Sequence, residues 1–104
     1  MTPANQARLD AMLRYVRSDD PDLTPRQIAM LMVVTWTPGP HTVRALAETL
    51  GVAKPVITRS SNRLINVGLI LRRIDKTDRR SVIITPTELA GPFLERSADV
   101  AAAA

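Results

Sequence analysis

The stretch from Leu46 to Thr85 constrains the fold of this chain more than any other. Its first half predicts two short helices. Gly51 can end the first in the left-handed conformation, and Pro55 suits the first turn of the second, where a missing N–H costs nothing. Its second half predicts a hairpin, because two β-branched runs, Leu69 to Ile74 and Val82 to Thr85, flank a charged segment. The order is therefore helix, turn, helix and hairpin.

The second of these helices, residues 54–67, has one apolar and one polar face. Ile57, Ser61, Leu64 and Ile65 recur at helical spacing and are expected to point inward. A polar, basic helix face beside a basic hairpin is typical of a winged helix-turn-helix. The predicted fold class is therefore mainly α with a small β-hairpin wing.

Basic residues gather on this part of the chain. Between Lys54 and Arg80 the sequence has eight basic and two acidic residues, a net charge of +6. The remainder has six basic and eight acidic residues, a net charge of −2. Positive charge concentrated on one element is the footprint expected of a protein that binds a polyanion such as nucleic acid.

These features predict a transcriptional regulator that binds double-stranded DNA in a sequence-specific way, with helix 54–67 in the major groove. Arginine pairs with guanine and asparagine with adenine through two hydrogen bonds, and a valine methyl can meet a thymine methyl. The predicted base-reading residues are Val56, Thr58, Arg59 and Asn62. Contacts to phosphates, which supply affinity and register, are predicted for Lys54, Ser60, Arg63, Arg72 and Arg73.

The chain also resembles a known family. The segments KPVITRSSNRLINVGLILRR and DKTDRRSVIITP resemble the MarR family of winged-helix transcription regulators, and the resemblance runs from about Leu23 to Leu94. Ser61 stands where the family usually has an apolar core residue, and Ala53 where a capping Ser or Asp is common. The resemblance implies that wing 75–81 reaches the minor groove, with Asp78 orienting an arginine. The implied wing contacts are Lys76, Asp78, Arg79 and Arg80.

Residues 1–104 are expected to form a single domain, with flanking helices in 1–19 and 86–104 as possible dimerisation elements. In the first helix, Leu9, Met12, Leu13 and Val16 form an apolar stripe, and part of this stripe is expected to pack in the core of the same chain. The side chains left for a partner are Ala7, Ala11, Tyr15, Phe93, Leu94 and the alanine tail. Because this surface is small, we expect a weak homodimer. In the resembled family, effector pockets lie between the dimerisation helices and the DNA-binding core. The short terminal segments leave few residues to line such a pocket, and the sequence does not indicate an effector, which stays unknown.

Local signals place the remaining elements. Thr24 and Gln27 form a capping box that starts the most apolar helix, and Pro38-Gly39-Pro40 ends it. His41 to Val43 can add a short third strand. The segment Thr85-Pro86-Thr87-Glu88 repeats the capping pattern and predicts the start of a final helix, with a kink or a restart at Pro92.

Composition excludes several functions. The chain has no cysteine and one histidine, which leaves no catalytic triad or thiolate metal site, and no glycine-rich phosphate loop precedes a helix. We therefore expect no enzyme activity, no cofactor and no metal. His41 and Trp36 are interpreted as structural, with Trp36 in or at the edge of the core. No membrane span or signal peptide is evident, so the cytoplasm is the expected compartment.

An alternative to DNA binding is a winged-helix protein-interaction module within a larger nucleic-acid-associated assembly. Such a module should carry apolar anchors on its exposed helix face. Here the corresponding residues, Thr58, Arg59 and Asn62, are polar, which favours DNA.

Overall fold

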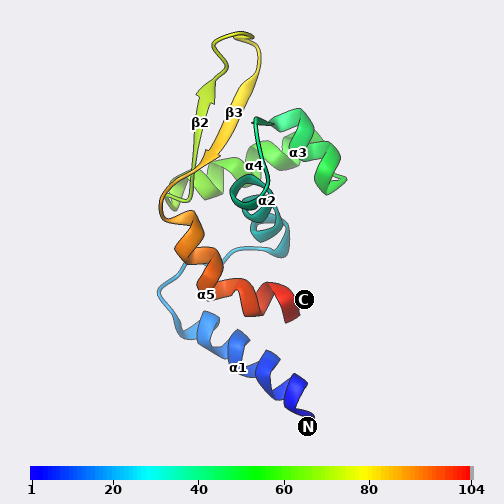
Figure 1. The fold of residues 1–104 in the computed structure, drawn as a ribbon, viewed down its shortest axis with the longest axis vertical. Helices are drawn as coiled ribbons and strands as arrows, with labels where there is room; N and C mark the ends of the chain where they lie inside the picture. The colour runs from blue at the N-terminus through cyan, green and yellow to red at the C-terminus, as the bar shows by residue number, and fades with distance from the viewer. Residues whose placement is uncertain (104) are drawn as a thin grey trace.

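The structure is a computed structural model that describes residues 1–103, with side chains described through Ser97. Helix α1 and the hairpin lie at opposite ends of an elongated molecule, 53 × 25 × 22 Å in extent (Figure 1). The elements in chain order are α1 (Pro3–Arg17), α2 (Pro25–Trp36), β1 (His41–Thr42), α3 (Val43–Leu50), α4 (Lys54–Asn66), β2 (Ile70–Ile74), β3 (Val82–Pro86) and α5 (Ala90–Ala103).

Two predicted helix boundaries, the start of α2 and the end of α3, appear in the structure. The hydroxyl of Thr24 accepts a hydrogen bond from the backbone N–H of Gln27 at 3.1 Å. The Gln27 side chain accepts one from the N–H of Thr24 at 3.0 Å, which completes the capping box. Gly51 ends α3 with φ at 68°, a left-handed conformation that costs a residue with a Cβ more than it costs glycine. Both predictions are confirmed.

The hairpin and a short third strand form one antiparallel sheet of order β1-β3-β2. The two long strands pair from Ile70 opposite Pro86 to Ile74 opposite Val82, and the short strand places His41 opposite Ile84. The predicted third strand is therefore confirmed. Because β1 has only two residues, β3 has a neighbour on that side along only part of its length.

One apolar core joins the helices to the sheet. Met30 and Leu31 of α2 are fully buried, as are Ile57 of α4 and Phe93 of α5. The hydroxyl of Ser61 is buried among them and donates to the backbone carbonyl of Ile57 at 2.7 Å. A buried polar group costs little when it is hydrogen-bonded, which explains how serine occupies a core position.

The final helix begins later than the capping pattern predicts. Strand β3 continues through Pro86, and the N–H of Thr87 donates to the carbonyl of Leu69 at 3.0 Å. The Thr87 hydroxyl donates to the Gly68 carbonyl at 2.6 Å. Pairing with β2 therefore keeps this backbone extended, and α5 starts at Ala90. Pro92 then falls in the first turn, where proline is tolerated without a kink.

The apolar surface of α1 also differs from the prediction. Ala11, Phe93 and Leu94 are buried within the chain, because α1 packs on α5 through Ala11 and Tyr15. The large apolar side chains left exposed on α1 are Leu9, Met12 and Val16, at 43%, 47% and 71%. Of the predicted set, Ala7 is exposed and Tyr15 is partly buried, so the apolar surface offered to a partner is mainly this stripe. The alanine tail belongs to that set, but its side chains lie outside those described.

Trp36 is 56% exposed at the end of α2, so its predicted place in or beside the core is wrong. No helix in residues 1–103 combines the length and apolarity that crossing a membrane requires.

Candidate nucleic-acid interface

Helix α4 presents its predicted polar face to solvent. Its inner side carries Ile57 and Leu64, which fix the rotation of the helix by packing into the core. The side chains on the outer face are exposed, and these are Lys54, Thr58, Arg59, Asn62 and Arg63. Val56 is partly exposed at the edge of that face. Three cations and two short polar groups on one helix face can meet phosphates and base edges together.

Ser60 does not belong to this face. Its side chain is only 6% exposed, beside Ser61 and one helical turn from Ile57 and Leu64. This burial argues against the predicted phosphate contact of Ser60, because the rotation of α4 that buries its apolar stripe also buries Ser60.

Strand β2 and helix α4 meet through Arg72 and Asn62. A guanidinium nitrogen of Arg72, on β2, donates to the side-chain oxygen of Asn62 at 3.4 Å. This bond is long and exposed, so it orients the Asn62 side chain but contributes little to the stability of the fold. The bond uses the side-chain oxygen of Asn62 and none of its amide N–H donors. The side chain predicted to read adenine is thus oriented by a residue predicted to contact phosphate.

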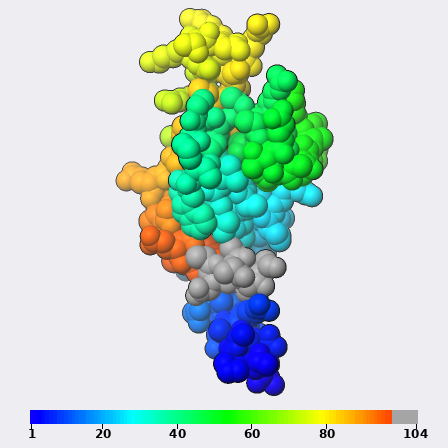
Figure 2. Space-filling model, turned by 45° about the vertical axis from the view of Figure 1, so that its right-hand side comes forward, coloured from blue at the N-terminus to red at the C-terminus, as the bar shows by residue number. Residues whose placement is uncertain are grey.

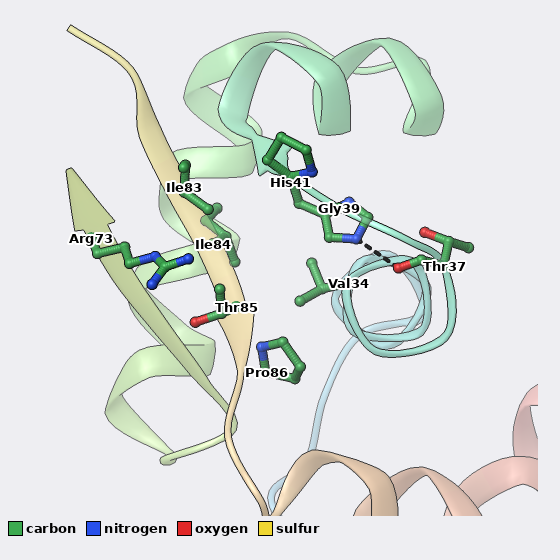
Figure 3. Close-up of a pocket in the computed structure, with 10 residues that line it drawn as sticks. Val34, Thr37, Gly39, His41, Arg73, Ile83, Ile84, Thr85 and Pro86 are labelled. Carbon is green, nitrogen blue, oxygen red and sulfur yellow. Dashed lines mark hydrogen bonds between the residues drawn. The ribbon is translucent and has the colours of Figure 1, made fainter. Parts of the chain in front are cut away.

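Arg73 lies on the other face of β2, because successive side chains of a strand point to opposite faces. It stands opposite Ile83 and lines a cavity beside α2 (Figure 3). Its predicted phosphate contact is untested, but Arg72 and Arg73 do not share a surface.

Two aspartates order the turn between β2 and β3. The carboxylate of Asp75 accepts hydrogen bonds from the N–H and hydroxyl of Thr77, at 3.0 and 2.8 Å, and these bonds lower the pKa of Asp75. The carboxylate of Asp78 accepts bonds from the N–H of Arg80 at 3.1 Å and from the hydroxyl of Ser81 at 3.2 Å. The wing tip is thus a hydrogen-bonded turn rather than an open loop. The sequence reasoning missed Thr77 and Ser81, although an Asp two residues before a Thr is a recognisable turn signal.

The cations of the wing remain exposed around this turn. Nε of Arg80 lies 3.7 Å from a carboxylate oxygen of Asp78, yet the Arg80 side chain is 96% exposed. Lys76 and Arg79 are exposed as well. Figure 2 shows the hairpin tip standing away from the body of the molecule, so its cations can reach a surface beside that met by α4. The implied role of Asp78 matches this contact, while minor-groove binding stays a prediction.

Metal chemistry has no evident site in the described part of the chain. Among the side chains described, those of residues 1–97, no group of three or more His, Cys, Asp or Glu can hold a metal ion.

Comparison with known proteins identifies the family. The MarR family profile matches residues 23–82. A crystal structure of MarR is 31% identical with a TM-score of 0.69, over 75% of this chain and 56% of that one. The transcriptional repressor CouR, bound to a 23-mer DNA duplex, is 26% identical with a TM-score of 0.74, over 95% of this chain and 65% of CouR.

The FabT protein of Streptococcus pneumoniae, in complex with DNA, shares the fold at 22% identity with a TM-score of 0.73, over 88% of this chain and 63% of FabT. This chain thus spans less than two thirds of the length of these relatives. The profile nonetheless covers more than half of the chain, and the winged-helix architecture is the same. The chain belongs to the MarR family.

Proposed function

We propose that this chain is a transcriptional regulator that binds double-stranded DNA at specific sequences. In this proposal α4 enters the major groove, and the wing, residues 75–81, lies along the adjacent minor groove. The observation that carries it is the outer face of α4, where Arg59, Asn62 and Arg63 are exposed together next to the basic hairpin. We propose that, as a DNA-binding regulator, it acts in the cytoplasm.

The relatives support DNA over a protein partner. CouR, at 26% identity, has been solved on a DNA duplex. A protein-docking helix would need apolar anchors at its centre, whereas the α4 face carries cations and amide groups that suit phosphates and base edges.

We further propose a weak homodimer on DNA. The exposed stripe of Leu9, Met12 and Val16 supplies apolar surface on α1, far from the wing. A two-fold dimer would place two α4 helices on half-sites about one helical turn apart, and the operator would be an inverted repeat.

A comparison of Arg59→Ala with Arg63→Ala tests base reading. Both side chains are exposed on the same helix face, so each substitution removes one cation. The operator is first selected from genomic fragments, and binding to it and to a scrambled duplex is then measured across a salt series.

Arg63→Ala should weaken both duplexes about equally and reduce the salt slope by roughly one. Arg59→Ala should cost about 1–3 kcal/mol on the operator and flatten preference at one base pair. Equal losses on both duplexes for Arg59→Ala would contradict base reading. Failure of the native chain to retain any fragment at low salt would contradict DNA binding itself.

A further inference from the structure

Arg72 of β2 and Asn62 of α4 form a side-chain pair that joins two elements of the candidate interface. A guanidinium nitrogen of Arg72 donates to the side-chain oxygen of Asn62 at 3.4 Å, and both side chains are exposed. Asn62 follows Arg59 by three residues, so these two side chains lie on the same face of α4. The pair therefore stands on the surface that the proposed function assigns to the major groove.

The backbones that carry the two side chains are fixed relative to each other. The N–H of Leu69 donates to the carbonyl of Leu64 at 3.0 Å, which joins the end of α4 directly to the start of β2. In the sheet, Arg72 stands opposite Ile84, which is fully buried in the core. The fold therefore presents the guanidinium to Asn62 before any DNA binds.

This contact decides which way the Asn62 amide is turned. A guanidinium has hydrogens to donate and no atom that accepts, so it can pair only with the amide oxygen. If the amide were turned over, its N–H groups would face those of Arg72, donor against donor. The bond is weak at 3.4 Å, but the orientation depends on the difference between an attraction and a repulsion. Arg72 therefore selects one orientation of the amide.

A fixed amide changes which base Asn62 can recognise. An asparagine that pairs with adenine uses its oxygen to accept from N6 and its N–H to donate to N7. Here the adenine amino group would compete with the guanidinium of Arg72 for the same oxygen. The hydrogen-bonding groups that remain on the pair are chiefly N–H donors. Guanine suits them, because N7 and O6 on its major-groove edge both accept.

We propose that Arg72 is a positioning residue that determines specificity, because it holds Asn62 so that the pair reads guanine rather than adenine at one base pair of the operator. This role rests on the proposed DNA binding, and it replaces the adenine contact predicted for Asn62 from its residue type alone. Arg72 acts through the side chain that meets the base.

Selection from a randomised duplex library gives the operator of the native chain. Asn62→Ala then identifies the base pair in question, as the position at which the preference is lost. There the native chain should bind guanine about tenfold more tightly than adenine. Arg72→Met frees the amide oxygen, so this ratio should fall about tenfold. The ratio compares duplexes that differ at one base pair, and the loss of one phosphate-attracting cation cancels from it.

Arg73→Met is the matched control, because it removes the same charge from the next position of β2, on the opposite face of the strand. It should leave the ratio near tenfold, whatever the overall affinity. Both substitutions change exposed side chains, and circular dichroism verifies that the variants remain folded. In the free chain, the NMR signals of the Asn62 amide should shift with Arg72→Met and stay in place with Arg73→Met.

Three outcomes would overturn the positioning role while DNA binding stands. These are an unchanged guanine preference in Arg72→Met, adenine at the position that Asn62→Ala flattens, and no position flattened at all. An Asn62 amide signal that responds equally to both Met substitutions would overturn the pair itself. A native chain that retains no duplex at low salt would instead contradict the proposed function, and the role of Arg72 would fall with it.

Discussion

The hydroxyl of Tyr15 holds α1 to the rest of the chain and is the group whose removal is easiest to interpret. It donates to the carbonyl of Pro21 at 2.7 Å and accepts from the N–H of Leu23 at 3.2 Å. The loop after α1 therefore wraps around one oxygen atom. The ring meets that of Phe93 edge-on, with centroids 6.2 Å apart and an interplanar angle of 86°.

Tyr15→Phe removes both hydrogen bonds and keeps the contact with Phe93. Leu23 is buried, so its N–H is left without a partner in a place where water enters with difficulty. Leaving such groups unpaired costs about 1–3 kcal/mol. For a domain of this size, each kcal/mol lowers the melting temperature by roughly 4–8 °C.

Urea denaturation followed by circular dichroism measures this loss. Thr58→Val is the matched control, because its hydroxyl donates to the Lys54 carbonyl at 3.3 Å on an exposed face and should contribute well under about 1 kcal/mol. A free energy of unfolding for Tyr15→Phe within experimental error of the native value would refute the reasoning.

The pH dependence gives a second test of the same substitution. Burial raises the pKa of Tyr15, chiefly because it disfavours the charged phenolate. A raised folded-state pKa contributes stability that is complete below the unfolded value of 10.0 and is lost as the pH rises through the folded value. The difference between the native chain and Tyr15→Phe should therefore shrink above pH 10.

Three further outcomes are expected. Arg96 donates to both carboxylate oxygens of Asp20, at 3.0 and 2.8 Å, and these bonds lower the pKa of Asp20. Arg96→Met should therefore destabilise the chain at neutral pH. This loss of stability should disappear as the pH falls below 3.8, the pKa of Asp20 in the unfolded chain, and through the lower folded value. A loss that is independent of pH would contradict the pairing. Replacing Arg79 and Arg80 together by alanine should reduce the affinity for DNA most on operators with A·T-rich flanks, where the minor groove is narrow. If the double variant still protects those flanks fully in footprinting, the wing has only a structural role. Sedimentation across a concentration series should show a dimer that forms at micromolar or higher concentration. A chain that stays monomeric at every concentration and protects only one half-site in footprinting would exclude the proposed dimer.

Much of the secondary structure follows from signals between residues close in sequence. The cap at Thr24 and the stop at Gly51 appear where the sequence predicts them. Each depends on hydrogen bonds or backbone angles within a single turn, so no distant contact is needed to form it. The outer face of α4 was predictable for a similar reason, because the helical period separates its cations from Ile57 and Leu64.

The predictions that failed depend on contacts between distant segments. The segment from Thr85 to Glu88 has the pattern of a capping box, but Thr87 bonds to Leu69 and Gly68 across the hairpin and stays extended. On α1 the sequence could not indicate which part of the apolar stripe α5 covers. The packing of Tyr15 on Phe93 decides this, and it leaves Leu9, Met12 and Val16 exposed.

The arginine pair on β2 distinguishes most clearly what the sequence determined from what the tertiary structure decided. The sequence by itself determined that Arg72 and Arg73 are cations on a strand, and hence that they point to opposite faces. Only the tertiary structure decided which one meets Asn62 and which one lines the cavity beside α2. The physical reason is that alternation along a strand is a property of the backbone, whereas the surroundings of each face depend on where α2 and α4 pack against the sheet.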